Sequence, residues 1–242
     1  MSKIFNSILN RSNSYKYYKN NFDKLQKSEK KLKESNKKFK KENEDLNRLL
    51  SYYKGTFEST LPGRLLTKKE VITFQPDDPY YNEKRWDQYY QEIVEELLKL
   101  RDINSVLELG PYKAPFIEGS DVMDHRDYSE FFPLDINKVI IHDCSEVPYP
   151  IKDKEYDLVI ASQCIEHFGI YGQQVNIFKE LSRISKKAIV SLPYKWYRPL
   201  ARDHHMIDER VFNAWQGDLK HYYQRISKLT ILRIYDFENQ DL

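Results

Sequence analysis

The order of apolar and polar positions after residue 100 alternates short β-branched runs with helical stretches. Such runs, bounded by turn residues, are typical of strands in a parallel, doubly wound sheet that is covered by helices. The predicted strands are 105–109, 121–124, 138–143, 156–161, 188–192 and 229–235, with a helix near 175–184. The pattern therefore predicts an α/β fold with a mostly parallel sheet.

The stretch ahead of this sheet has a different pattern. Glycines and prolines interrupt residues 55–81, which predicts a connector with one short strand at Val71–Phe74. Asn82 can cap a helix that runs to about Arg101, with an apolar side at helical spacing. We therefore place the globular domain at residues 82–242.

Residues 1–54 form a separate, basic extension in which positions 15–54 lack Gly and Pro and carry a heptad pattern. With Phe22 at position a, position d is apolar in all five heptads, whereas position a is polar in three. This seam predicts a coiled coil, and asparagine at position a favours a parallel homodimer. A single solvated helix, or one lying on the body, remains an equal alternative. The d residues are Leu25, Leu32, Phe39, Leu46 and Tyr53, and the asparagines are Asn36 and Asn43.

The formal net charge of +2 hides two oppositely charged parts. Residues 15–54 hold 13 basic and 6 acidic side chains, a net of +7, and Lys3 and Arg11 add two more, which leaves −7 for residues 55–242. An apolar stripe ahead of the lysines makes peripheral membrane contact an alternative for the extension. Nucleic acid is disfavoured, because no stacking aromatics alternate with the lysines. The stripe is Ile4, Phe5, Ile8 and Leu9.

The chain has the features of a cytoplasmic protein. No apolar run approaches the roughly 20 residues of a membrane span, and the first residues lack a continuous apolar core of a secretion signal. The two cysteines, Cys144 and Cys164, are 20 positions apart and fit neither a disulfide framework nor a zinc site. We expect the cytoplasm, with the inner membrane surface as an alternative location.

Acidic residues stand at the ends of three successive predicted strands, at Glu108, Asp124 and Asp143. In open α/β sheets, ligands bind outside the carboxyl ends of the strands. Three carboxylates there predict a ligand with hydroxyls and amines, or a cation, rather than a bare phosphate.

These residues resemble the motifs of class I S-adenosylmethionine-dependent methyltransferases, type 11-like. Val106-Leu-Glu108-Leu-Gly110 is similar to the acidic strand and glycine turn, Asp124 to the acid that holds the ribose, and Asp143 to the acid near the adenine. The most specific likeness is the block from Pro150 through Asp157-Leu-Val to Glu166-His167. The resemblance spans residues 100–200 and implies S-adenosylmethionine as the cofactor. It assigns cofactor binding to Glu108, Gly110, Pro111, Asp124, Asp143, Cys144, Ser162 and Gln163.

The glycine turn departs from the family pattern, because Gly110 is followed by Pro-Tyr-Lys-Ala-Pro. One glycine is left to let the backbone approach the methionine part of the cofactor. Residues 111–120 are also short for a helix, so we expect a loop. A non-catalytic relative is therefore the alternative to an active enzyme.

Methyl transfer from a sulfonium requires an aligned acceptor and, for a hydroxyl, a base. The resemblance places the reaction centre at His167, and His204 and His205 follow the fifth strand, from the region that usually shapes the acceptor site. The alternatives are a histidine bonded at a helix start and a polar loop, and Glu166 fits a local structural role. A metal site formed by Glu166, His167 and one of the later histidines is a minor alternative, but no metal-ligand spacing within one helix supports it, and we expect no metal.

Aromatic and arginine side chains surround these histidines, which suits a sugar or a phosphorylated small-molecule acceptor. The candidate substrate-binding residues are Tyr194, Trp196, Arg198 and Arg202. The chain also resembles methyltransferases of bacterial surface-polysaccharide (capsule) clusters, which implies O-methylation in capsule polysaccharide biosynthesis. Two alternatives remain: an interaction protein that works through its coiled coil, and a protein or RNA methyltransferase.

Overall fold

The computed structural model describes residues 20, 24, 27–41, 43, 46, 61–73, 80–168, 172–196, 206–227 and 229–239. The chain divides into two compact units, residues 1–54 and 55–242. None of the helices in these described stretches is long and apolar enough to cross a membrane.

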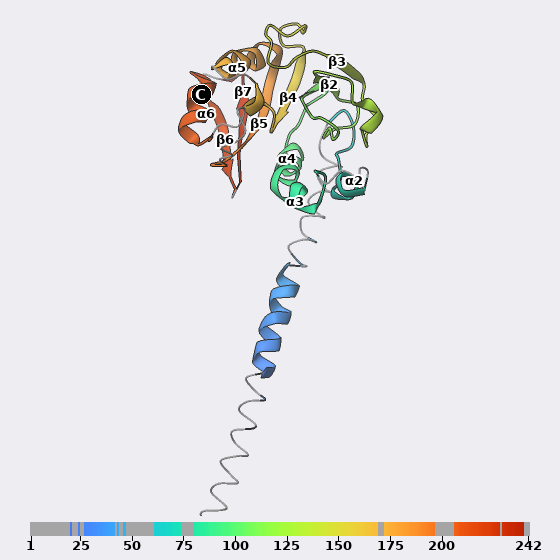
Figure 1. The fold of residues 1–242 in the computed structure, drawn as a ribbon, viewed down its shortest axis with the longest axis vertical. Coiled ribbons are helices and arrows are strands. Elements are labelled where there is room, and N and C mark those ends of the chain that lie inside the picture. The colour runs from blue at the N-terminus through green and yellow to red at the C-terminus, as the bar shows by residue number, and fades with distance from the viewer. Residues whose placement is uncertain are drawn as a thin grey trace, which may run out of the picture. The chain divides into compact units, whose positions relative to one another are not determined.

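The first unit contains a helix over residues 27–41 whose side chains are exposed (Figure 1). An ion pair one turn apart, between Lys33 Nζ and Glu29 Oε1 at 2.7 Å, supports it. The apolar stripe at residues 4–9 lies outside the described residues. The helix is present, and its pairing into a coiled coil stays a prediction.

The second unit is built on a seven-stranded sheet with the order β3-β2-β1-β4-β5-β7-β6 (Figure 1). The pairs among β1 to β5 are parallel, whereas β7 runs antiparallel to both β5 and β6. The predicted mostly parallel α/β sheet is therefore confirmed. The strands are Val106–Leu109 (β1), Asp121–Asp124 (β2), Lys138–Ile141 (β3), Tyr156–Ser162 (β4), Ser185–Pro193 (β5), His221–Ile226 (β6) and Thr230–Asp236 (β7).

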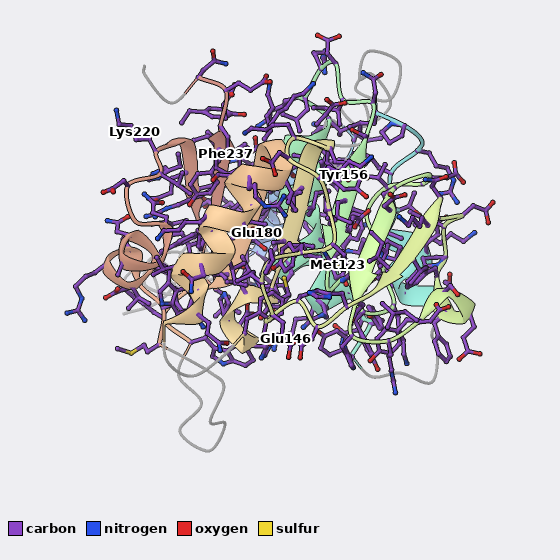
Figure 2. All side chains as sticks on the ribbon, turned by 90° about the horizontal axis from the view of Figure 1, so that it is seen from above. Met123, Glu146, Tyr156, Glu180, Lys220 and Phe237 are labelled. Atoms are coloured by element: carbon purple, nitrogen blue, oxygen red, sulfur yellow. The ribbon has the colours of Figure 1, made fainter. Side chains whose placement is uncertain are left out.

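Helices cover both faces of this sheet. On one face, α5 (Gln173–Ile184) and α6 (Glu209–Gln216) pack together through the rings of Phe178 and Phe212, 5.8 Å apart. The ribbon of α5 lies along that face (Figure 2). On the other face lies a continuous helical segment. It is joined to the sheet by a hydrogen bond of 2.8 Å that Thr230 Oγ1 of β7 donates to Gln88 O. It consists of α3 (Glu83–Arg85), the π-helical η1 (Trp86–Tyr90) and α4 (Gln91–Leu97).

The predicted strand at Val71–Phe74 is wrong, because Lys68–Thr73 forms helix α2. Thr67 Oγ1 accepts a hydrogen bond from Glu70 N at 3.3 Å, while Glu70 Oε2 accepts one from Thr67 N at 2.8 Å. This reciprocal capping box starts a helix and outweighs the strand preference of the β-branched residues that follow. The stretch also joins the sheet domain, since Leu65 forms an antiparallel bridge with Ile117.

Two other elements were not predicted. Asp208 caps α6 by accepting a hydrogen bond from Val211 N at 2.9 Å, and β6 alternates half-buried and exposed residues, as an edge strand does. The expected loop at residues 111–120 is confirmed, because no helix forms there. The connection from β2 to β3 likewise holds only the short 3-10 helix Ser129–Phe131 (η2).

Candidate functional site

The candidate site lies at the carboxyl ends of β1, β2 and β4. From β1 the chain runs outward through β2 to β3, and it then crosses back to β4 on the other side of β1. The strand order therefore reverses at β1, and such a reversal leaves a crevice at the strand ends. A cavity of about 30 Å³ lies here. Its walls come from the segment before the sheet, the turn after β1 and the end of β4: Tyr80, Tyr81, Arg85, Tyr89, Tyr90, Gly110, Pro111, Tyr112, Ala114, Phe116, Ser162 and Gln163.

Glu108 faces the loop after β1 rather than this cavity. Its carboxylate accepts hydrogen bonds from Phe116 N at 2.7 Å, Ile117 N at 2.9 Å and Ser120 Oγ at 2.9 Å. Burial raises the pKa of Glu108 to about 7, and the two backbone N–H donors act in the opposite direction. Glu108 therefore fixes the path of the loop, and both of its oxygens are engaged there.

Gly110 and Pro111, by contrast, line the cavity. Gly110 has φ +55°, and a Cβ added there would lie 3.1 Å from the Cβ of Cys164, so a larger residue would be strained. Tyr112 takes φ +57° without being a glycine. A tyrosine thus adopts the left-handed conformation in a turn that has only one glycine.

Asp124 ends β2 with its side chain buried and both oxygens bonded. Oδ1 accepts a hydrogen bond from His125 N at 2.8 Å and contacts His125 Nδ1 at 2.6 Å, and Oδ2 accepts from Tyr112 N at 3.3 Å. The ring of His125 is exposed, so it can leave Asp124 without disturbing the core. Asp124 is consequently a buried carboxylate with one replaceable partner.

Asp143 and Cys144 follow β3 in a turn. Asp143 Oδ1 accepts hydrogen bonds from Ser145 Oγ at 2.7 Å and Ser145 N at 2.9 Å, and these bonds lower the pKa of Asp143. Cys144 is buried, its Sγ donates to Met123 O at 3.4 Å, and burial raises its pKa to about 12. Asp143 is therefore a charged turn former, and Cys144 is an unreactive apolar filler beside it.

Ser162 and Gln163 line the cavity from the end of β4. Ser162 Oγ lies 3.1 Å from Ser191 Oγ, and Gln163 Nε2 donates to the same Ser191 Oγ at 3.2 Å. Because these contacts tie the end of β4 to β5, both side chains are held in place beside the cavity.

His167 is accessible, whereas the neighbouring Glu166 is not. Both belong to η3 (Ile165–His167), where the side chain of His167 is 41% exposed and Nε2 lies 3.8 Å from Glu166 Oε1. Glu166 is 2% exposed, its Oε2 has no hydrogen-bond partner among the described residues, and burial raises its pKa to about 8. At pH 7 Glu166 is thus mainly uncharged, whereas the ring of His167 is accessible to solvent.

The predicted acceptor residues are only partly described. Tyr194 donates a hydrogen bond to the Glu209 carboxylate, at 3.0 Å from both oxygens, which directs it to α6 rather than to the cavity. Trp196 is half-buried. Within the described ranges, no group of three His, Cys, Asp or Glu side chains could hold a metal ion. The predicted residues Arg198, Arg202, His204 and His205 lie outside the described residues.

The wall formed by residues 80–90 was not predicted from the sequence. Tyr81 OH accepts a hydrogen bond from Lys113 N at 3.1 Å, and its ring stacks on Tyr112 at 6.3 Å. The sequence feature that could have predicted this wall is the run of aromatic residues around Arg85, which we interpreted as the buried side of a helix. These contacts bring the segment across the strand ends.

Fold and site together define a doubly wound α/β protein with a buried acid, a glycine turn and a small cavity at its switch point. No protein-family model matches the chain, and no curated protein matches its sequence. Among solved structures, it is similar to a protein from Pyrococcus horikoshii OT3 at 14% identity and TM-score 0.48, over 69% of this chain and 95% of that one.

Two further similar structures are methyltransferases by description. One is a SAM-dependent methyltransferase from Aquifex aeolicus, at 13% identity and TM-score 0.46, over 70% of this chain and 98% of that one. The other is the N-methyltransferase NodS from Bradyrhizobium japonicum, at 12% identity and TM-score 0.46, over 66% of this chain and 97% of that one. Because one fold hosts many activities, function has to be inferred from the site.

Proposed function

We propose that this chain is an S-adenosylmethionine-dependent methyltransferase that methylates an oxygen of a sugar or a phosphorylated small molecule in surface-polysaccharide (capsule) biosynthesis. The observation that carries the proposal is the buried carboxylate of Asp124 at the end of β2, next to the Gly110 turn at the end of β1. In doubly wound sheets, an acid at this place accepts hydrogen bonds from ribose hydroxyls.

Three features of the strand ends support this cofactor. Asp124 can exchange its bond to the exposed His125 ring for bonds from the ribose hydroxyls. Asp143, charged and bonded through Oδ1, suits the adenine amine, and Gly110, the single glycine of the turn, would let the backbone approach the methionine part. When bound, the cofactor supplies a methyl group already activated on its sulfonium.

The protein's own part in the chemistry is alignment and proton removal. We assign proton removal to His167, because its accessible ring follows β4 at the candidate site. Ser162 and Gln163, held by Ser191, would orient the acceptor beside the turn. Glu166 is mainly protonated at pH 7 and does not compete for the proton of the acceptor.

Isothermal titration of the full chain with S-adenosylmethionine and S-adenosylhomocysteine tests this function. We expect saturable one-site binding of both, since the buried Asp124 can form charge-assisted hydrogen bonds. No heat at high micromolar cofactor would contradict the proposal. A screen of nucleotide sugars and phosphorylated metabolites, with labelled methyl transfer as the readout, then identifies the acceptor.

We further propose that residues 15–54 form a parallel homodimer, an interaction function that holds even if catalysis is weak. Three predicted d residues, spaced seven apart on the helical extension, are exposed: Leu32 by 62%, Phe39 by 61% and Leu46 by 56%. Burying them against a second copy removes apolar surface from water. We expect light scattering to give a dimer for the wild type and a monomer for Leu32→Glu/Phe39→Glu. The matched change Lys41→Glu, at heptad position f on the side away from the seam, leaves the dimer intact, and a monomeric wild type would refute the pairing.

A further inference from the structure

The cavity at the strand ends contains one charged side chain, Arg85, among otherwise uncharged lining residues. Arg85 comes from α3, and its guanidinium contacts the rings of two tyrosines. Its Cζ lies 3.4 Å from the ring centroid of Tyr80 and 4.7 Å from that of Tyr89. These stacked contacts, together with a hydrogen bond to the Tyr90 side chain, hold the guanidinium over the cavity.

Arg85 has an unused donor in this position. Its Nε is buried and has no hydrogen-bond partner, and no carboxylate of the described residues lies within ion-pair distance of it. A buried donor without a partner is costly, so a ligand that accepts a hydrogen bond from it would remove that cost. The charge of Glu166 acts on Arg85, and among the described residues the buried Oε2 of Glu166 also lacks a hydrogen-bond partner.

The charge of Arg85 is not neutralised at neutral pH. Burial raises the pKa of Glu166 to about 8, so at pH 7 this carboxyl mostly carries its proton. The remaining cavity walls are tyrosines, small residues and the amide and hydroxyl of Gln163 and Ser162. An anionic group therefore gains a charge-assisted partner here and meets no like charge.

The size of the cavity narrows the class of anion. About 30 Å³ holds roughly two water-sized groups, which is enough for a carboxylate but not for a nucleoside. The planar guanidinium fork matches a planar carboxylate. Arg85 also interacts electrostatically with Glu166, which follows β4. Because β4 and β2 lie on opposite sides of β1, Glu166 and the ribose-binding candidate Asp124 follow strands on opposite sides of β1.

We propose that Arg85 binds a carboxylate of the methyl acceptor, so that the acceptor is a carboxylic acid such as an acidic sugar. This inference rests on the proposed methyltransferase function. A carboxylate can also come from the amino-acid part of the cofactor, and the experiment separates these two sources. Arg85 is thereby a specificity-determining residue of the acceptor site.

The test uses acetate as the carboxylate probe and acetamide as its uncharged isostere, on the full chain. The readout is the 1H–15N signal of the Arg85 Nε–H group, identified by its absence in Arg85→Lys. We expect acetate, and not acetamide, to shift this signal saturably, both without cofactor and with S-adenosylhomocysteine bound. Arg85→Met should weaken acetate binding, followed at neighbouring backbone signals, by at least about tenfold.

The matched control is Arg126→Met, because Arg126 also stacks on a tyrosine, with its Cζ 4.3 Å from the Tyr128 ring centroid, yet is exposed and outside the cavity. We expect it to bind acetate as the wild type does. Should Arg85→Met not fold, Arg85→Lys keeps the charge without the fork, and it is expected to retain only part of the affinity.

The pH dependence provides a readout that a purely structural role would not give. Above pH 8 Glu166 ionises and competes for Arg85, so acetate binding should weaken as pH rises from 7 to 9, and Glu166→Gln should remove this decline. The other groups facing Glu166 are Cys164, whose pKa burial raises well above its usual range, and His167, 3.8 Å from Glu166.

Two results overturn the proposal. One is an Arg85 signal that responds equally to acetate and acetamide. The other is acetate binding that S-adenosylhomocysteine abolishes but 5′-methylthioadenosine, which lacks the amino-acid part, leaves intact, because the carboxylate is then the cofactor's own. The proposed function fails on a different result, namely a wild type that binds neither S-adenosylhomocysteine nor 5′-methylthioadenosine. That result does not depend on whether acetate binds.

Discussion

Replacing Asp124 by Ala should weaken binding of S-adenosylhomocysteine by at least about 100-fold at pH 7. The buried carboxylate would offer two charge-assisted hydrogen bonds to the ribose hydroxyls, each worth about 1.5–3 kcal/mol. Alanine removes both acceptors and cannot replace them with solvent in a buried position. Isothermal titration of wild type and variant measures the effect, and Asp124→Asn, which keeps the shape, should lose most of the affinity as well.

The control for this prediction is Asp127→Ala, three residues further along the same loop. Asp127 is exposed, and its Oδ1 accepts a hydrogen bond from Ser129 N at 2.7 Å, so it shares the loop but not the buried position. Circular dichroism should show folded protein for both variants. If Asp124→Ala binds within about threefold of the wild type, less than 1 kcal/mol has been lost, and Asp124 does not hold the ribose.

Replacing His167 by Ala should lower kcat by about 10²–10⁴-fold, the usual contribution of a general base, and leave cofactor affinity within about twofold. The imidazole is accessible in η3, which follows β4, and the uncharged, buried Glu166 offers no substitute base at pH 7. The measurement is labelled methyl transfer to the acceptor that the screen identifies, together with titration of S-adenosylhomocysteine.

His142→Ala is the matched control, since His142 Nε2 lies 2.8 Å from Glu146 O, in the turn after β3 and away from the cavity. It should turn over as the wild type does. A His167→Ala variant with full turnover would show that His167 is not the base and would shift the role to residues after β5.

Much of the fold follows from local patterns in the sequence. The short β-branched runs predicted β1 to β5 within a few residues, because a buried strand needs apolar side chains on both faces. The helix α2 was also recoverable, since Thr67 and Glu70 have the spacing of a capping box, but the β-branched residues after it were weighed more heavily. The antiparallel direction of β7 has no local signal and depends on the packing of the β6–β7 pair.

The site was predictable only in part, because side-chain direction depends on partners far away in the chain. All four residues of β1 are buried, so nothing in its pattern shows that Glu108 turns to the loop at 116–120. Arg85 is separated from Gly110 and Ser162 by long stretches of sequence and meets them only in the folded domain.

By itself, the sequence determined the alternating α/β elements, the acid after each of the first three strands and the exposed seam of the extension, because each is a property of neighbouring residues. Only the tertiary structure decided which of those acids is engaged in holding a loop, which keeps a replaceable partner, and which arginine covers the cavity. These outcomes follow from burial and from hydrogen bonds between distant segments, which exist only once the sheet has brought the strand ends together.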